Sequence, residues 1–401
     1  MRIFDWSTTP GAAADATSRF RKQFLGRRVL VILAAVSLIL FVGGIVFAID
    51  IERLSTRRAE LQRTADEAAL AAASKLISEG ELGSDPEMKT AIFAARSIAS
   101  DRIGRSLAQI GRGQESESEV NAADVEVAIG HLPASSDGGD ELDFNDTSRY
   151  NAVRVLIRQT DHESSEFCLF LSQILGFGGS LLQVDATAVV DRQIRALRTP
   201  GDDRRLNILP FALDERTWSG LVEEHAEDNW TWDSRTGMIH ECPDGIREIN
   251  LYPRENGAAS DRGTVDIGGQ SSASDVAYQI LHGVSAEDLQ HHNGVLDLDG
   301  KKRLRLPGEK GISAGVQDEL EQIKGEPRIL PLFRTVSSSD HKATYTIVRF
   351  VGVRVMEVQL RGPSRAKRVI VQPAAIAVPG AISTTEPGMS SLVFTPAHLV
   401  D

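Results

Sequence analysis

The hydrophobic pattern begins with one long apolar run, Val29 to Ile49, which contains no charged residue. A helix rises about 1.5 Å per residue, so a run of this length covers the roughly 30 Å hydrocarbon core of a bilayer. The run lacks the alternation of polar and apolar residues that marks a barrel strand. The pattern therefore predicts a single transmembrane helix over residues 29–49.

The charges that flank this run predict its orientation. Five basic residues lie close before it, Arg19, Arg21, Lys22, Arg27 and Arg28, and Asp50 and Glu52 follow it at once. The positive-inside rule then assigns residues 1–28 to the cytoplasm as a basic leader and residues 50–401 to the extracytoplasmic side of the membrane. A cleaved signal peptide is the alternative, but its apolar core has only about 7–15 residues and ends at a small-x-small site, which Ala48-Ile49-Asp50 does not supply.

The helical pattern continues beyond the apolar run as a stalk over residues 50–79, which contain neither Gly nor Pro. Most of these residues are good helix formers, so we expect the helix to leave the bilayer unbroken. An apolar stripe of mostly small side chains recurs at helical spacing: Leu54, Leu61, Ala65, Ala68 and Ala72. This stripe predicts either a stalk that lies on its own domain or one that packs against neighbouring subunits.

The remaining pattern predicts an α+β chain. Asp85 and Pro86 are typical of a helix start, and the alternating runs 125–129, 153–158 and 181–190 predict strands. Ser285 with Asp288 three residues later is a capping-box signature, which predicts a short helix over 286–292. An apolar stretch at 165–175 predicts a short core helix. Strands rich in β-branched residues are expected at 344–355, 356–360 and 368–372. We expect an α+β domain over 80–200, a β-rich domain over 206–373, and an extended or mobile, proline-containing tail over 374–401.

Composition narrows the class of protein. The 401 residues carry a net charge of −12. Residues 1–28 contain six basic and two acidic residues, a net charge of +4, so residues 29–401 carry a net charge of about −16. An acidic extracytoplasmic body argues against nucleic acid and against docking on anionic lipid, since both require basic patches.

Candidate chemistry is sparse. Gly311-Ile312-Ser313-Ala314-Gly315 matches the G-x-S-x-G pattern of serine hydrolases, but no apolar strand precedes it, and the simpler interpretation is that Ser313 or Gly315 opens a helix over 316–323. His240, Cys242, His282, His291 and His292 fall in no metal-binding spacing, so no metal and no cofactor is expected. The cysteines Cys168 and Cys242 lie where disulfides can form, and a bridge between them is one possibility beside a buried free thiol.

The residues around the stalk resemble a known family. A transmembrane helix, Ala48-Ile49-Asp50 and then Leu61-Gln62-x-x-Ala65-Asp66-x-Ala68-Ala69-Leu70-Ala71 are similar to the N-terminal segment of TadE/TadG-like proteins, over about residues 24–77. The resemblance implies a component of the Tad, or Flp, pilus assembly system, with other Tad components or minor pilins as partners. Some TadG proteins carry an Asp-x-Ser-x-Ser metal-dependent adhesion motif, which is absent from this sequence.

The leading hypothesis is therefore a membrane-anchored, non-enzymatic accessory or pseudopilin-like component that associates through its transmembrane helix and stalk. Gly44 and Ala48 form a small-x-x-x-small pair that permits close helix approach in lipid. The expected interaction residues are Gly44, Ala48, Asp50, Leu54, Leu61, Gln62, Ala65, Asp66, Ala68 and Leu70. Two alternatives stay open: a membrane-anchored extracytoplasmic hydrolase using Ser313, and an anchored binding domain unrelated to pili. No nucleic-acid partner and no small-molecule substrate is evident.

Overall fold

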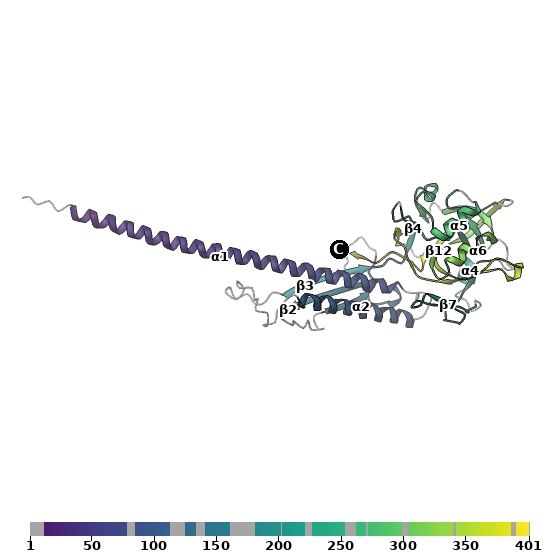
Figure 1. Ribbon diagram of the computed structural model, residues 1–401, viewed down its shortest axis with the longest axis horizontal. Helices are drawn as coiled ribbons and strands as arrows, with labels where there is room; N and C mark the ends of the chain where they lie inside the picture. Colours follow the sequence, from purple (N-terminus) through teal and green to yellow (C-terminus); the bar gives the residue numbers. More distant parts are fainter. Residues whose placement is uncertain are drawn as a thin grey trace, which may run out of the picture. The chain divides into compact units, whose positions relative to one another are not determined.

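A computed structural model describes most of the chain (Figure 1). The described residues are 12–77, 85–112, 125–133, 141–160, 181–201, 203–220, 227–252, 262–269, 272–298, 304–339, 342–385 and 390–400. The predicted core helix at 165–175 and the predicted disulfide partner Cys168 lie outside these residues. Contacts divide the chain into two compact units: residues 1–61 with 158–183, and residues 62–157 with 184–401.

The N-terminal helix α1 runs without a break over Ala12–Ala73 and ends in the 3₁₀ turn η1, Ser74–Leu76. The prediction that the helix continues past the apolar run is thus confirmed. Within the part of the chain that the structure describes, no helix is both long and apolar enough to cross a bilayer. Several side chains between residues 29 and 51 lie outside that part. Helix α2, Asp85–Arg112, begins at the predicted Asp85.

The second unit contains a four-stranded sheet in the order β1-β2-β3-β19. Its strands are β1 (Val125–Gly130), β2 (Ala152–Thr160), β3 (Leu181–Val189) and β19 (His398–Val400). β1 pairs antiparallel with β2 from Val125 opposite Ile157 to Gly130 opposite Ala152. Helix α2 packs against β1 and against the 3₁₀ turn η4, Thr147–Arg149 (Figure 1). The three strands predicted from alternation are confirmed.

The C-terminal half of the same unit contains a closed five-stranded barrel. Its strands pair in the cyclic order β11-β9-β5-β12-β13 and back to β11. Their bounds are β5 (Phe211–Asp214), β9 (Arg262–Val265), β11 (Leu304–Lys310), β12 (Pro327–Ser339) and β13 (Lys342–Gln359). β13 also pairs with β14 (Arg368–Pro373), which pairs with β8 (Ile249–Asn250). Closure leaves these strands few free edges.

The middle of β12 and of β13 is buried on both faces, which explains the apolar runs in these two strands. One cluster takes side chains from all five strands, including Ala212, Leu306 and Tyr345. A second cluster packs the other face of β12 and β13 against helices α4 (Glu215–Ser219), α5 (Ala273–His282) and α6 (Gln317–Gln322) (Figure 1). The α+β class predicted from the sequence is confirmed, with N-terminal helices followed by a β-rich region.

Several smaller helices and strands agree with the local sequence patterns that predicted them. The predicted strands 344–355 and 356–360 are one strand, β13, with a bulge between Val355 and Glu357. The 3₁₀ helix η5, Asp288–His292, carries the predicted capping box, because Asp288 accepts from the backbone N–H and the hydroxyl of Ser285. The other described elements are β4 (Ile194–Leu197), β6 (Thr231–Asp233), β7 (Met238–His240), β10 (Leu296–Asp297), η6 (Ala314–Val316) and η7 (Ser364–Ala366).

Residues 374–401, expected to be extended or mobile, differ from that expectation. They contain the short strands β15 (Ile376–Ala377), β16 (Ala381–Ser383), β17 (Ser390–Ser391), β18 (Val393–Phe394) and β19. β16 pairs with β4, β17 with β13, and β19 with β3. Apolar side chains between the prolines, such as Val393 and Phe394, are buried. The tail is therefore part of the core, since its prolines interrupt the backbone hydrogen bonds only locally.

Candidate functional site

The stalk is the first candidate site, and its predicted stripe is buried from Leu61 onward. Leu61 is 3% exposed, and Ala65, Ala68 and Ala72 are each 0% exposed. Leu70 is half-buried. Helix α2 buries a similar row of small residues, with Ala95 and Ala99 among them, and packs against η1 at the end of the stalk. Small side chains let helix backbones approach closely, so residues 62–76 of the stalk are an integral part of this unit.

Gln62 connects the stalk to the sheet. Its side-chain Nε2 donates to the backbone carbonyl of Asp185 in β3 at 2.8 Å and to Oδ1 of Asp66, one helical turn later, at 3.0 Å. The Asp66 carboxylate therefore orients the amide that binds the strand. This geometry gives the Gln-x-x-x-Asp spacing of the stalk a structural role, because residues four apart lie on the same helix face.

The sheet supplies a charged side chain beside this contact. Arg154 in β2 donates from Nη2 to Oδ2 of Asp185 at 2.9 Å. The groups border a cavity of about 450 Å³, which is lined by Gln62, Asp66, Leu132, Arg154, Asp185, Ala186, Thr187, Leu399 and Val400. Leu399, at its edge, is 40% exposed. Both ion-paired side chains are also substantially exposed, so the pair contributes little to stability by itself.

The predicted residues of the first unit have a different environment. Gly44 and Ala48 are exposed, and a side chain added at Gly44 would meet no other atom of the described chain. The side chains of Asp50 and Leu54 lie outside the described residues. The structure therefore does not bring Gly44 and Ala48 together with the buried stripe of the stalk, and the interaction role of all these positions stays a prediction.

Cys242 is exposed and carries a free thiol, whose Sγ lies 3.3 Å from Oγ1 of Thr231. Its suggested partner Cys168 is outside the described residues, so the disulfide stays a prediction. Among the described residues no group of His, Cys, Asp and Glu side chains could hold a metal ion.

Ser313 has the local geometry of a helix cap. Its Oγ accepts a hydrogen bond from the backbone N–H of Gly315 at 3.2 Å, directly before η6. Asp318, one acid that a hydrolase would use, is ion-paired with Arg361 at 2.7 Å. The sequence offers Asp340 as the other acid and His341 or His398 as the histidine of a triad. Asp340 and His341 lie outside the described residues, and His398 is exposed on β19. The described geometry thus agrees with the capping interpretation of this motif.

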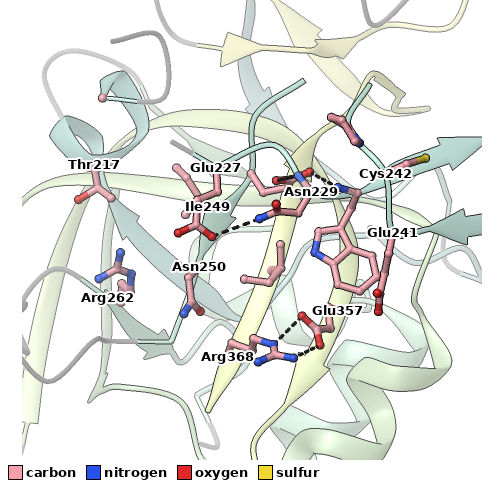
Figure 2. A pocket seen from close by; sticks show the side chains of 15 residues that line it. Thr217, Glu227, Asn229, Glu241, Cys242, Ile249, Asn250, Arg262, Glu357 and Arg368 are labelled. Atoms are coloured by element: carbon pink, nitrogen blue, oxygen red, sulfur yellow. Dashed lines mark hydrogen bonds and ion pairs between the residues drawn. The ribbon is translucent and has the colours of Figure 1, made fainter. Parts of the chain in front are cut away.

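A second cavity, of about 800 Å³, was not predicted from the sequence (Figure 2). Its lining comes from the segments on both sides of the β6–β7 hairpin, from β8, from the beginning of β9, and from β13 and β14. Four glutamates line it, Glu227, Glu241, Glu248 and Glu357, together with Arg262, Arg368, Asn229, Asn250 and Trp230. The density of acidic residues between 223 and 248 was the signal that could have indicated it.

Glu248 is the buried member of this set, at 7% exposure. Its two carboxylate oxygens accept from the backbone N–H groups of Asn229 and Trp230, at 3.0 and 2.9 Å. Burial raises the pKa of Glu248 to about 7, and the neighbouring charges of Asp228 and Asp244 add to the effect. The two backbone donors oppose the shift because they favour the charged form.

Glu357 and Arg368 form an ion pair on the opposite wall, where Arg368 Nε donates to Oε2 of Glu357 at 2.6 Å (Figure 2). Hydrogen bonding to Glu357 raises the pKa of Arg368 above its ordinary range. Arg262 from β9 and Asn250 from β8 also line the cavity (Figure 2). The lining thus contains the ion pair of Glu357 with Arg368 and three further glutamates, Glu227, Glu241 and Glu248.

The chain was compared with known proteins. No curated protein and no solved structure matches it. A family model, Tad, described as Flp pilus-assembly TadE/G-like, matches residues 28–75. The match spans the whole apolar run and most of the stalk, including Gln62 and Asp66. Residues 28–75 are therefore a TadE/G-like Flp pilus-assembly domain.

Proposed function

We propose that this protein is a single-pass, non-enzymatic component of a Tad/Flp pilus assembly machine in the inner membrane. It acts there as an accessory or pseudopilin-like subunit. The observation that carries the proposal is the TadE/G-like domain at residues 28–75. This family assembles pili, so its components in the cell envelope are the expected partners.

The surface of α1 supports the membrane anchor. Seven large apolar side chains between residues 32 and 45 are exposed, among them Leu33 at 63%, Leu38 at 62% and Phe41 at 68%. At about 100° per residue they surround the whole helix and do not form one stripe. A helix that is apolar on every side and exposed along its length requires an apolar surrounding, which lipid supplies.

The proposal assigns the contact between subunits to the exposed part of α1. The stripe from Leu61 to Ala72 is buried within the chain itself, whereas Gly44 and Ala48 are exposed, and a Cβ added at Gly44 would meet nothing within 4 Å. Small residues four apart allow a second helix to approach closely within the membrane. The sheet and barrel that follow the stalk would then be held at the membrane surface as the interaction module.

The experiment combines localisation with crosslinking in cells. Cysteines placed at Gly44 and Ala48, in a background without Cys168 and Cys242, should give crosslinked products that contain a Tad component. Leu38→Asp places a charge at the middle of the span, which costs about 2.5–3.5 kcal/mol of insertion free energy, and should release the protein from alkali-washed membranes. A matched control is Thr56→Asp, at an exposed position of α1 beyond the apolar run.

Two results would contradict the proposal. Wild-type protein that alkali removes from membranes would exclude the anchor. A cysteine at Thr56 is the control for crosslinking. Products that form equally from cysteines at Gly44 and at Thr56 would exclude a specific contact within the membrane.

A further inference from the structure

The pattern Asn-x-Ser/Thr, with x other than proline, occurs at two places in the sequence: Asn145-Asp146-Thr147 and Asn229-Trp230-Thr231. This pattern is the acceptor for N-linked glycans, and in a protein that leaves the cytoplasm it marks a surface loop. Neither place belongs to the segment 28–75 that matches the family model. The proposed assembly function therefore does not account for them.

The two places share the same local chemistry. The Oδ1 of Asp143, two residues before Asn145, accepts a hydrogen bond from the side-chain Nδ2 of Asn145 at 2.6 Å. In the same way, Glu227 Oε2 accepts from Asn229 Nδ2 at 3.2 Å (Figure 2). Both asparagines are exposed. Exposure and local hydrogen bonding therefore do not distinguish the two amides, and the difference lies in the backbone around them.

The backbone at Asn229 is held by more distant parts of the chain. The buried carboxylate of Glu248 accepts from the backbone N–H groups of Asn229 and Trp230. Thr231 begins β6, which pairs with β7, and its hydroxyl donates to the carbonyl oxygen of Cys242 at 2.6 Å. Binding of these residues in the active site of a transferase requires that the segment leave the fold. At Asn229 this step breaks strand pairing and deprives a buried carboxylate of its donors, which costs free energy.

The backbone at Asn145 is held by short-range bonds. Residues 144–146 are exposed and connect the β-bridge at Asp143 to the turn η4. The N–H of Asn145 donates to the Asp143 carboxylate at 2.9 Å, and the carbonyl of Asp146 accepts from the N–H of Arg149 at 3.1 Å. These bonds join residues two and three positions apart. Residues 144–147 can therefore leave the surface while the strands of the sheet stay paired.

An exposed aromatic ring lies next to this acceptor. Phe144, directly before Asn145, is 56% exposed. Water solvates such an apolar ring poorly. N-linked glycans are bulky and solubilising, so a sugar on Asn145 would cover part of the ring. The amide of Asn145 is thus accessible, locally held and beside a surface that a glycan would protect.

We propose that Asn145 is an acceptor for an N-linked glycan and that Asn229 is not modified in the folded chain. An oligosaccharyltransferase supplies the glycan from a lipid diphosphate donor. Nδ2 of Asn145 attacks C1 of the first sugar, so that a C1–N bond forms and the C1–O bond to the diphosphate breaks. The lipid diphosphate leaves with the bonding electron pair, and the transferase takes the proton released from Nδ2. In cells the modification rests on the proposed function, because residues 50–401 must lie on the extracytoplasmic side, where the donor faces.

Mass spectrometry of the full chain, purified in detergent from the cells that produce it, tests the proposal. We expect the intact mass to increase by one glycan and a glycopeptide that carries this glycan on Asn145. Asn145→Gln and Thr147→Ala should remove the increase, whereas Thr147→Ser should retain it, since serine supplies the same hydroxyl. Asn145 is exposed, so its replacement should leave the fold intact, which near-ultraviolet circular dichroism checks.

The second acceptor pattern is the matched control. Asn229→Gln should leave the mass increase unchanged. In the wild type, the glycan occupancy of Asn229 should be at least about tenfold lower than that of Asn145, because the segment at β6 must first open. Equal occupancy of the two asparagines would contradict the role of the backbone in selecting Asn145.

A measurement outside the cell separates this site from the proposed function. Unmodified full chain, made by cell-free translation in detergent micelles, is mixed with solubilised membranes of the same cells, which supply the transferase and the donor. Transfer to Asn145 in micelles but not in cells would keep the acceptor and contradict the extracytoplasmic position of residues 50–401. The absence of a glycan on Asn145 in both preparations would overturn the acceptor, as would a mass increase that persists in Asn145→Gln, and neither result bears on pilus assembly.

Discussion

The side-chain amide of Gln62 on helix α1 donates a 2.8 Å hydrogen bond to the backbone carbonyl of Asp185 on strand β3, 123 positions later in the chain. A second bond from the same nitrogen to Asp66 fixes the direction of the amide. Two residues of the TadE/G-like segment thus hold the helix on the sheet. Both residues lie within the segment that matches the family model, and their hydrogen bonds give them a structural role in this chain.

Replacement of Gln62 should loosen this attachment. Gln62→Ala removes both hydrogen bonds and should lower the free energy of unfolding by about 1–2 kcal/mol. Gln62→Glu should cost more, because a carboxylate would face both Asp66 and the carbonyl oxygen of Asp185. Urea unfolding of the full chain in detergent, with amide exchange in β3, measures both effects. Equal stability of the two variants would contradict this account of the contact.

Ala68 should not tolerate a larger side chain. It is fully buried, so Ala68→Leu overpacks the helix contact and should destabilise the fold by about 1–3 kcal/mol. Ala59, on the same helix, is exposed and serves as the matched control, since Ala59→Leu adds the same atoms without a clash. Thermal unfolding of both variants compares them. A loss of partner crosslinking with unchanged thermal stability in Ala68→Leu would instead favour a role between subunits.

Glu248 should make stability depend on pH. Its pKa is about 7 in the folded chain and near 4.5 when unfolded, so folding favours the protonated form. The stabilising contribution is complete below pH 4.5 and is lost as the pH rises through 7, by up to about 3 kcal/mol. Glu248→Gln cannot titrate, so the stability difference between wild type and variant should decline from pH 5 to pH 8. Parallel pH profiles of the two proteins in urea unfolding would exclude this assignment.

Ser313 should be dispensable for function. Ser313→Ala removes the bond to the N–H of Gly315 and should cost about 1 kcal/mol of stability, as expected for loss of a helix cap. Pilus assembly should be unaffected in cells. Asp214→Ala, which removes the cap of α4, is the matched control and should cost a similar amount. Abolished assembly in Ser313→Ala, with Asp214→Ala unaffected, would revive the hydrolase hypothesis.

Gly352 in β13 should not tolerate a side chain. A Cβ there would lie 2.1 Å from the carbonyl oxygen of Ala374 and 2.6 Å from that of Leu392, both in the C-terminal tail. Gly352→Ala should therefore displace the tail and cost several kcal/mol, with early proteolysis after residue 374. Gly104→Ala, in helix α2 with nothing within 4 Å, should instead stabilise the chain by up to about 1 kcal/mol.

The sequence alone determined the features that depend on local patterning. An uncharged run, a helix without Gly or Pro, the capping box at Ser285 and the β-branched strands each follow from interactions between residues close in the chain. The stalk motif also indicated the similarity to the TadE/G-like family over residues 28–75, because Gln62, Asp66 and the alanines form a specific order within one helix. These are the signals that need no knowledge of distant contacts.

Tertiary structure decided the rest. The tail suggested mobility because of its prolines, yet long-range pairing of β19 with β3 and burial of Phe394 incorporate it into the core. The stripe of the stalk had two interpretations, and only the fold shows that Ala65 and Ala68 are covered within the chain. The acidic cavity joins Glu227 to Glu357 and Arg368, which are more than a hundred residues away in sequence. Such groups meet through strand pairing, which no local pattern encodes.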